Sequence, residues 1–417
     1  MNDPWVIGDQ SGLSFPADPA TFRDAGVPFL TNAFQTPVSE MTRCKEVTGG
    51  STGRKMLLDV EYPDPQRGLQ TELFVKFSRD FDDPVRDRGR TQMESEVKFA
   101  SLSLTPGFPI VVPRTLFADY HRATGTGILI SERIAFGTNG IEPQYHKCLD
   151  YEMPGPADHY RALLTSIARL AGAHRSGRLP TPLTDEFPVD LRAATVGEPP
   201  PLTPDRLHRR VTRLAEFADA YPGLLPDNVR SRGFLDRMAI EAPQVLQNEA
   251  AIWRCLAEAT DYIALSHWNA NVDNAWFWTG DDGVLRCGLM DWGCVSQLNV
   301  AMAIWGAMSA AEIDLWDDHF DEFVEMFCNE VVVSGGPTLD PAALERQVTL
   351  YALLMGVTWL MDVPALIRSR TPDGGAAIRR TDPTIKGDES VRAPLQMLTN
   401  VLNLWEHTDM REVLRGL

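Results

Sequence analysis

The chain has 417 residues, of which 44% are hydrophobic and 23% are charged, a composition typical of an ordinary globular protein. Its length is sufficient for two domains, or for two lobes around a cleft. The formal net charge of −18 would repel phosphate backbones, so nucleic acid is not expected as the main partner. The same charge is compatible with a cationic small substrate and equally with solubility alone.

Neither a membrane span nor export is expected from the sequence. A run of about 18 apolar residues is absent, and Met1–Trp5 lacks the basic start and apolar core of a signal peptide. The six cysteines have no CxxC spacing, which favours reduced thiols in a cytoplasmic protein over a zinc site or a disulfide framework. They are Cys44, Cys148, Cys255, Cys287, Cys294 and Cys328.

The N-terminal third is expected to be rich in β-structure. Residues 1–40 form an extension with a short helix near Pro19–Ala25, and residues 41–135 form a small lobe. In this lobe, helical spacing places Met93 and Val97 on one face of a helix over Arg90–Leu104. Apolar runs predict strands at Cys44–Thr48, Lys55–Tyr62, Glu72–Ser78, Val111–Tyr120 and Thr126–Ile134.

Residues 136–417 are expected to form a larger, mainly helical lobe. Pro199-Pro200-Pro201 excludes regular structure within a linker at Leu179–Pro204. Two short strands are expected at Asn274–Trp278 and Leu285–Met290, and a polar loop at Thr371–Lys386. A β-rich part followed by a helical part gives the α+β fold class, with two lobes. The expected helices are Asp158–Arg175, Pro204–Tyr221, Asn228–Glu241, Gln247–Ala259, Asn299–Ser309, Ile313–Val333, Pro341–Val363 and Val391–Trp405.

A glycine-rich hairpin separates the first two strands of the small lobe. It contains Gly49, Gly50, Ser51 and Gly53. Residues without a Cβ atom allow backbone N–H groups to approach a phosphate closely. Such a hairpin is more often a plain turn, so the glycines alone do not define a site.

Lys76 lies inside the apolar strand Glu72–Ser78. A lysine there usually points to solvent, but it could also neutralise the phosphate oxygens of a nucleotide. A glutamate on the following helix would hold it in place, and both Glu94 and Glu96 are candidates. Glu96 is preferred because its neighbours Val97 and Phe99 are apolar.

The most specific pattern runs from His267 to Asn274 and continues with Asp291-Trp292-Gly293, where Asp291 lies 17 residues after Asn274. This is the spacing of the catalytic loop and metal-binding turn of a kinase, in which the histidine braces the backbone. A hairpin between Asn274 and Asp291 would bring both side chains to one cation. Amide and carboxylate oxygens are ligands that Mg²⁺ accepts alongside phosphate oxygens.

On these motifs the chain resembles the aminoglycoside phosphotransferase and choline kinase-like group, including its ecdysteroid-kinase-like branch, within the protein-kinase-like fold. The group's pattern is His-Gly-Asp-x-x-x-x-Asn followed by Asp-Trp or Asp-Phe-Gly. The segment Ile167–His174 resembles its "LARLHA" helix, and residues 128–134 resemble the hinge that holds adenine, which implies contacts at Ser131 and Ile134. The resemblance covers about residues 40–365. It implies ATP and Mg²⁺ as cofactors and phosphoryl transfer to a hydroxyl of a small molecule.

Three positions depart from that pattern: Trp268 replaces the glycine, Asn269 replaces the catalytic aspartate, and Asn299 stands where an aspartate usually follows the turn. An amide cannot accept the proton of a hydroxyl, although Asn269 can orient one through its amide oxygen. A general base contributes about 10²–10⁴-fold, and positioning and electrostatics supply most of the rest. We therefore expect a slow enzyme. Asp273 is a weak substitute base, because it is expected to point elsewhere. A substrate that is already ionised would need no base.

Three functions remain open from the sequence. The first is an ATP- and Mg²⁺-dependent phosphotransferase acting on a hydroxylated small molecule. The second, motivated by Asn269, is a nucleotide-binding pseudokinase with a regulatory or interaction role. The third is transfer of a nucleotidyl group from ATP bound in reversed orientation. Retention of both Asn274 and Asp291 favours the first, because an unpaired buried carboxylate is costly to keep.

Overall fold

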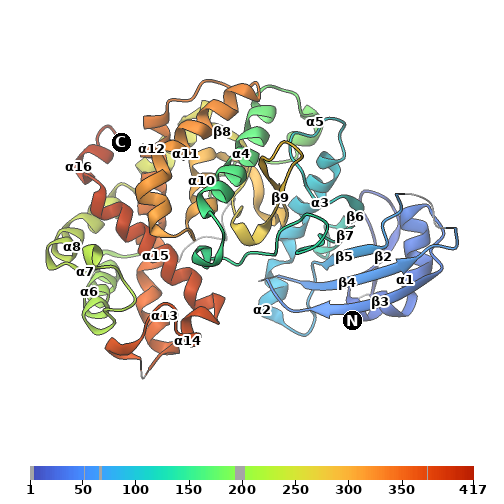
Figure 1. The fold of residues 1–417 in the computed structure, drawn as a ribbon, viewed down its shortest axis with the longest axis horizontal. Coiled ribbons are helices and arrows are strands. Elements are labelled where there is room, and N and C mark those ends of the chain that lie inside the picture. Colours follow the sequence, from blue (N-terminus) through green and yellow to red (C-terminus); the bar gives the residue numbers. More distant parts are fainter. Residues whose placement is uncertain (1–3, 51, 65–67, 193–201, 373) are drawn as a thin grey trace. The chain divides into compact units, whose positions relative to one another are not determined.

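The computed structural model describes residues 4–50, 52–64, 68–192, 202–372 and 374–417 (Figure 1). The chain forms two compact units. Unit 1 consists of Met1–Ile141, Gly177–Pro188 and Gly288–Val295, and unit 2 consists of Glu142–Ser176, Val189–Cys287 and Ser296–Leu417. A β-rich N-terminal part and a mainly helical C-terminal part confirm the expected α+β class.

A five-stranded antiparallel sheet forms the centre of unit 1. All five strands expected in residues 41–135 are present. The expected strand at Val111–Tyr120 starts later, because Pro113 cannot donate to a ladder, and Val111 makes only an isolated bridge with Gly288. In spatial order the strands are β3 (Glu40–Val47), β4 (Arg54–Glu61), β5 (Glu72–Phe77), β7 (Thr126–Glu132) and β6 (Thr115–His121).

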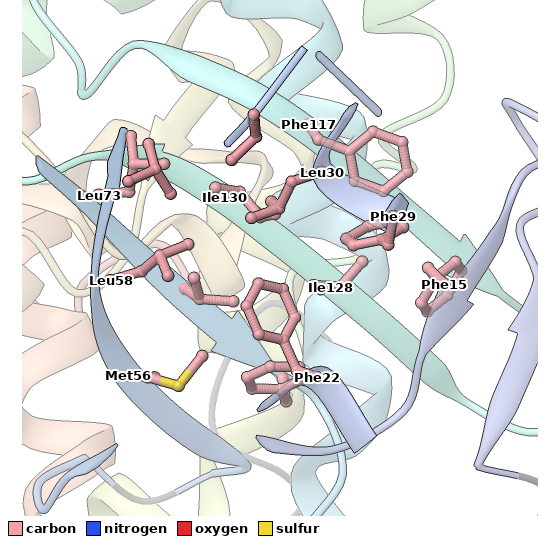
Figure 2. Packing of buried hydrophobic residues seen from close by; sticks show 14 of the residues in the cluster. Phe15, Phe22, Phe29, Leu30, Met56, Leu58, Leu73, Phe117, Ile128 and Ile130 are labelled. Carbon is pink, nitrogen blue, oxygen red and sulfur yellow. The ribbon is translucent and has the colours of Figure 1, made fainter. Parts of the chain in front are cut away.

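Each face of this sheet is covered by one helix. Side chains alternate between the two faces of a strand, and on β7 this places Ile128 and Ile130 in a cluster with Phe22 of α1 (Pro19–Phe34), as Figure 2 shows. The intervening Leu129 packs with Val97 of α3 (Gln92–Ser103) on the opposite face. Residues of the sheet can therefore be assigned to the α1 face or the α3 face.

The N-terminal extension is more ordered than the sequence indicated. Helix α1 was expected near Pro19–Ala25 but continues to Phe34, although Pro28 lies inside it. Non-helical backbone angles at Ala25 divide it, so the second half restarts with Pro28 near its beginning, where the missing N–H is tolerated. Two short strands, β1 (Trp5–Ile7) and β2 (Ser14–Pro16), pair antiparallel and were not expected.

Helices dominate unit 2. The expected helix at Pro341–Val363 is interrupted after Thr358, and the expected linker at Leu179–Pro204 includes the one-turn helix α5 (Thr181–Thr184), which belongs to unit 1. Pro199-Pro200-Pro201 lies outside the described residues. The helices of unit 2 are α4 (Pro156–Arg175), α6 (Pro204–Ala220), α7 (Asp227–Arg230), α8 (Arg232–Gln247), α9 (Glu249–Glu258), α10 (Val300–Met308), α11 (Ile313–Val333), α12 (Pro341–Thr358), α13 (Val363–Arg370), α14 (Pro383–Lys386), α15 (Glu389–His407) and α16 (Met410–Val413).

Helix α4 supports the short strands around the His267 motif. Its His174 accepts a hydrogen bond at Nδ1 from the Leu265 N–H (3.3 Å), and its Ser166 donates Oγ–H to the Cys287 carbonyl (3.0 Å). The strands are β8 (Ile263–His267), which pairs with β11 (Val295–Asn299), and β9 (Ala275–Thr279), which pairs with β10 (Leu285–Leu289). The segment Ile167–His174, which resembles a family helix, thus lies in the helix that supports the strands around the His267 motif.

Among the described residues, no single helix is both long enough and apolar enough to cross a bilayer. The bent pair Pro341–Thr358 and Leu360–Arg370 has the required length and composition only when its two parts are taken together.

Candidate active site

The glycine hairpin between β3 and β4 requires glycine for its backbone conformation. Gly49, Gly50 and Gly53 have φ values of +135°, +68° and +53°, a region that other residues rarely adopt. A Cβ atom on Gly53 would lie 1.9 Å from the Phe77 carbonyl oxygen. Arg86 donates to the carbonyl oxygens of Gly50 (2.8 Å) and Gly53, so the turn is braced from outside. Ser51, the fourth predicted residue of the hairpin, lies outside the described residues.

Lys76 of β5 is held between two carboxylates of unit 1. Its Nζ lies 2.6 Å from Glu96 Oε1 and 2.7 Å from Asp291 Oδ1. Because Val75 and Phe77 belong to the cluster on the α1 face, the intervening Lys76 points to the α3 face, where Glu96 lies. The lysine side chain is 12% exposed, so it does not point to solvent as an isolated strand lysine usually would.

Burial and charge act in opposite directions on this cluster. Burial alone would lower the pKa of the Lys76 ammonium, but Asp291 and Glu96 outweigh it and hold that pKa well above its usual value. Burial raises the pKa of the Glu96 carboxyl, an effect that the Lys76 charge opposes. The two carboxylates therefore keep Lys76 charged in a largely buried position.

The choice between the two candidate glutamates is resolved by their contacts. Glu96 contacts Lys76, whereas Glu94 Oε1 lies 2.8 Å from Arg122 Nη2 and 3.1 Å from Lys98 Nζ. Glu96 is also one of the buried residues of α3. The apolar neighbours that favoured Glu96 in the sequence are the residues that turn its side of the helix inward.

Asp291 is positioned by the unusual backbone of its turn. It adopts a left-handed conformation (φ 66°, ψ 62°), and the next residue, Trp292, stacks on Phe99 of α3 with ring centroids 3.7 Å apart. Trp292 Nε1 also donates to the Leu289 carbonyl (3.1 Å). Phe99 lies three residues after Glu96, so one helix both supplies the glutamate and fixes the turn that carries Asp291.

Lys55 is a second lysine on the same face of the sheet, and the sequence analysis missed it. It lies opposite Lys76 in the antiparallel register of β4 and β5. Its Nζ donates to the Gly49 carbonyl oxygen at 3.0 Å. Burial lowers the pKa of Lys55, and repulsion from Lys76 lowers it further. The sequence contained a signal for it: Lys55 lies in the strand that begins just after Gly53. In a hairpin, a residue there can pair with Lys76 and point to the same face of the sheet.

The His267–Asn274 loop belongs to unit 2 and is held by hydrogen bonds to its own backbone. His267 is fully buried, and its Nδ1 accepts the Asn269 N–H at 3.1 Å. Asn274 Nδ2 donates to the Asn269 carbonyl at 2.8 Å. This bond fixes the orientation of the Asn274 amide, and Oδ1, as its acceptor atom, is the one suited to a cation. The predicted bracing role of His267 has this contact as its structural basis.

Asp273 is paired with a buried lysine. Its carboxylate is 3.5 Å from Nζ of Lys147, a buried residue. Burial alone would lower the pKa of Lys147, but Asp273 and then Glu389 outweigh it and raise that pKa. Asp273 therefore serves as a counter-charge for Lys147. That it points away from the acceptor remains a prediction.

The other two departures from the family pattern have structural explanations. Trp268 donates Nε1–H to the Tyr351 hydroxyl of α12 at 2.8 Å, and a Cβ atom on Gly306 of α10 would lie 1.6 Å from the Trp268 carbonyl oxygen. The tryptophan thus anchors the loop to closely packed helices. Asn299 is fully buried and caps α10, its Oδ1 accepting the Ala301 N–H at 2.9 Å. An N-cap needs only an acceptor, which an amide supplies.

The two predicted hinge residues lie at the end of β7. Ser131 is 8% exposed and its Oγ donates to the Glu132 carbonyl at 3.2 Å, while Ile134 is half-buried just beyond the strand. Their contacts with adenine remain a prediction. Convergence of Asn274 and Asp291 on one cation also remains a prediction. Within the described residues, no group of three or more His, Cys, Asp or Glu could hold a metal ion.

The Lys76 cluster and the His267–Asn274 loop differ in the chemistry that they can support. A lysine fixed between carboxylates, next to a glycine turn, is suited to bind the phosphates of a nucleotide. Asn274 and Asp291 offer hard oxygen atoms, and the Asp291 side chain is 44% exposed, so their chemistry fits Mg²⁺. The loop supplies amides where a base would stand.

No protein-family model matches the chain, and no curated protein matches it in sequence. Solved structures of phosphotransferases and kinases align with most of it. The AMP-bound spectinomycin phosphotransferase APH(9)-Ia is 8% identical, with a TM-score of 0.44 over 93% of this chain and 98% of that one. A microcompartment-associated aminopropanol kinase is 13% identical, with a TM-score of 0.43 over 89% and 95%. Choline kinase from Cryptosporidium parvum is 10% identical, with a TM-score of 0.43 over 90% and 91%. At this level of similarity, function has to be inferred from the side chains of the site itself.

Proposed function

We propose that the protein is an ATP- and Mg²⁺-dependent phosphotransferase that acts on a small molecule. The observation that carries this proposal is the Lys76 ammonium held at 2.6 Å from Glu96 and 2.7 Å from Asp291. A protein that needed this lysine only for stability would gain as much from an apolar side chain, because buried ion pairs are seldom better than well-packed hydrophobic residues. Fixed charges are what binding of a nucleotide requires.

Each group has one role in the proposed reaction. The backbone of Gly49, Gly50 and Gly53 approaches the phosphates, and Lys76 neutralises their oxygens while Glu96 holds it. Asn274 Oδ1 and the Asp291 carboxylate hold Mg²⁺, which when bound supplies charge stabilisation for the transferring phosphoryl group.

Asn269 affects the reaction of the molecule that would receive the phosphoryl group. The expected hydroxyl acceptor would have to lose its proton without a base at this position, since the amide cannot take it. Loss of a general base costs about 10²–10⁴-fold, while positioning and electrostatic stabilisation remain. The proposal is therefore of a slow transfer to a hydroxyl, or of transfer to a group that needs no base.

The proposal is tested by incubating the purified protein with ATP, Mg²⁺ and a metabolite pool, and measuring ADP and phosphorylated products by mass spectrometry. We expect Mg²⁺-dependent ADP formation that Asp291→Ala abolishes. Asp282→Ala is the matched control, because Asp282 is an exposed aspartate in the turn between β9 and β10 whose partner is Arg286. Complete absence of turnover, including ATP hydrolysis, contradicts the proposal. A product heavier by an adenylyl group would indicate nucleotidyl transfer instead.

A second candidate function, motivated by Asn269, is a pseudokinase that binds nucleotide without turnover. It predicts that ATP and Mg²⁺ raise the melting temperature while no ADP forms. It also predicts that Asp291→Ala leaves the cellular function of the protein intact, whereas the phosphotransferase proposal requires loss of that function.

A further inference from the structure

Three asparagines of the His267–Asn274 loop form one hydrogen-bonded network. The Asn269 carbonyl oxygen accepts the Asn271 N–H (2.9 Å) and Asn274 Nδ2 (2.8 Å). The Asn269 side-chain oxygen, Oδ1, accepts Asn271 Nδ2 at 2.7 Å. One lone pair of the Asn269 amide oxygen is therefore used inside the loop, whereas its donor end, Nδ2, makes no hydrogen bond within the described residues.

Burial of Asn271 determines which way round the two amides lie. Asn271 is 1% exposed, and its Oδ1 has no hydrogen-bond partner among the described residues. If both amides were rotated, Asn271 Nδ2 would occupy that position and would bury two N–H donors without an acceptor. Buried N–H groups without a partner are rarer than under-satisfied carbonyl oxygens. The network is thus stable with Asn269 Oδ1 turned inward.

Asn269 presents its donor end outward as a consequence. The residue is partly exposed, and Nδ2 makes no hydrogen bond within the described part of the chain. A side-chain amide in this position offers N–H groups to a bound molecule, and N–H groups bind anionic oxygens best. This is the reverse of an aspartate, which accepts hydrogen bonds only.

We infer that the acceptor of the proposed phosphoryl transfer is a carboxylate, bound through one oxygen by Asn269 Nδ2 while its other oxygen attacks phosphorus. This inference rests on the proposed function. The bond from the carboxylate oxygen to the γ-phosphorus forms, the bond from that phosphorus to the β–γ bridging oxygen breaks, and ADP leaves with the electron pair. Proton transfer is not part of the step, so no base is needed, and the product is an acyl phosphate.

A hydroxyl acceptor fits the same geometry poorly. An N–H donor directed at a hydroxyl oxygen would withdraw electron density from the nucleophile and could not take up its proton. A carboxylate is ionised near neutral pH and has two oxygens, one for the hydrogen bond and one for the attack. The one carboxylate of the loop, Asp273, is compensated by Lys147, so it does not oppose an anion at close range. The net charge of −18 on the whole chain acts over longer distances, where salt screens it.

The first test uses the wild-type chain with ADP and Mg²⁺ and asks which probe perturbs the Asn269 side-chain amide. The amide is observed by nitrogen-15 NMR and assigned by its absence in Asn269→Asp. Sodium benzoate is compared with benzyl alcohol, and sodium chloride at equal ionic strength is the control. We expect benzoate to shift the Asn269 amide resonance and benzyl alcohol to leave it unchanged. A shift with benzyl alcohol alone, or with neither probe, overturns the inference.

The second test uses Asn271→Asp, which replaces the amide that Asn269 Oδ1 now accepts from. A carboxylate at position 271 can only accept, so it would bind Asn269 Nδ2 and turn Oδ1 outward. We expect benzoate affinity to fall about tenfold, as for loss of one hydrogen bond to a charged group, with ATP–Mg²⁺ affinity unchanged. Asn248→Asp, at a partly exposed N-cap in unit 2, adds the same charge and should keep benzoate affinity.

Failure of the proposed function has a different signature. Were that proposal wrong, the wild-type chain would form no ADP from ATP and Mg²⁺, whatever the effect of benzoate on the Asn269 amide. A wild-type chain that turns over ATP with Mg²⁺ but whose Asn269 amide responds only to benzyl alcohol overturns the carboxylate inference alone. If Asn271→Asp does not fold, the wild-type amide measurement still decides the question.

Discussion

The Lys76 cluster of unit 1 and the His267–Asn274 loop of unit 2 hold their functional side chains by different means. In the cluster, a charged lysine is fixed by two carboxylates at 2.6 and 2.7 Å. In the loop, Asn269, Asn271 and Asn274 are linked by neutral amide and backbone hydrogen bonds. The cluster therefore fixes its side chains by charge, whereas the loop fixes them by neutral hydrogen bonds. Under the proposed function, the neutral loop position Asn269 is the one that would face the acceptor.

The largest expected effect comes from removing the charge at the centre of the cluster. Lys76→Met would leave Glu96 in a buried position without its cation, and breaking one side of a buried pair costs about 3–5 kcal/mol. We expect the free energy of unfolding in urea to fall by about this amount and Mg²⁺-dependent ATP turnover to be lost. Lys45→Met, at an exposed position of β3, is the control and should change neither quantity. Retention of ATP binding by Lys76→Met would contradict the role assigned to the cluster.

A buried carboxyl in unit 2 provides a contrast with the charged carboxylates of unit 1. Burial raises the pKa of Asp150 to about 7 from an ordinary 3.8, and its Oδ1 has no partner in the described part of the chain. Its Oδ2 accepts the Tyr160 hydroxyl (2.9 Å) and the Glu312 N–H (3.1 Å). An unfolded chain releases this proton below pH 5, whereas the folded protein keeps it until about pH 7. The group's contribution to stability is therefore fully present at low pH and lost as pH rises through 7.

Asp150→Asn removes this titration and keeps an acceptor for both bonds. Between pH 5 and pH 8 we expect its free energy of unfolding, relative to wild type, to rise by about 3 kcal/mol, from about two pH units of linkage. Urea unfolding at the two pH values measures it, and Asp158→Asn, an exposed aspartate of α4, is the control. A difference that does not change with pH would show that Asp150 is already ionised at pH 5.

A smaller effect is expected where the loop is anchored. Tyr351→Phe removes the hydroxyl that accepts Trp268 Nε1–H at 2.8 Å, and an unmade buried hydrogen bond costs about 1–2 kcal/mol. The free energy of unfolding should fall accordingly, while binding of ATP and Mg²⁺, which the proposed function assigns mainly to the Lys76 cluster, should be retained. A double-mutant cycle with Trp268→Phe should recover most of this as coupling between the two residues. Additive effects of the two substitutions would mean that the bond does not contribute.

The smallest effect tests the second lysine. Lys55→Met should weaken nucleotide affinity about five- to tenfold, or about 1 kcal/mol, because Lys55 adds a cation beside the glycine turn. Among the described residues, no carboxylate forms an ion pair with it. Isothermal titration with ATP and Mg²⁺ measures this, again with Lys45→Met as control. An unchanged affinity would leave Lys55 with the single role of supporting the Gly49 carbonyl.

Local patterns predicted much of the fold, and non-local pairing accounts for most of what was missed. The strands β3, β4 and β5 were found because their apolar residues alternate or cluster. The strand β8 (Ile263–His267) was missed because all five residues are buried, so it shows no alternation. Helix α1 was expected only near Pro19–Ala25, and its continuation to Phe34 accompanies tertiary packing of the helix on the sheet.

The candidate site shows the same division. The spacing from His267 to Asn274 is local, so the sequence could identify it, and the apolar neighbours of Glu96 pointed to the correct glutamate. The role of Lys55 depends on the register between β4 and β5, which is set by long-range pairing. Asn269 turns its amide oxygen inward because Asn271 is buried, and the spacing of residues in the sequence does not reveal this burial.

The stack of Trp292 on Phe99 has a mechanical consequence. Because the two rings lie 3.7 Å apart and nearly parallel, at 14°, the turn that carries Asp291 and the helix α3 that carries Glu96 share one rigid contact. Movement of Asp291 would move the adjacent Trp292, and the stacked ring would transmit that movement to Phe99 of α3. The two carboxylate partners of Lys76 are therefore coupled through one contact, because Glu96 and Asp291 lie on the two segments that this ring stack joins.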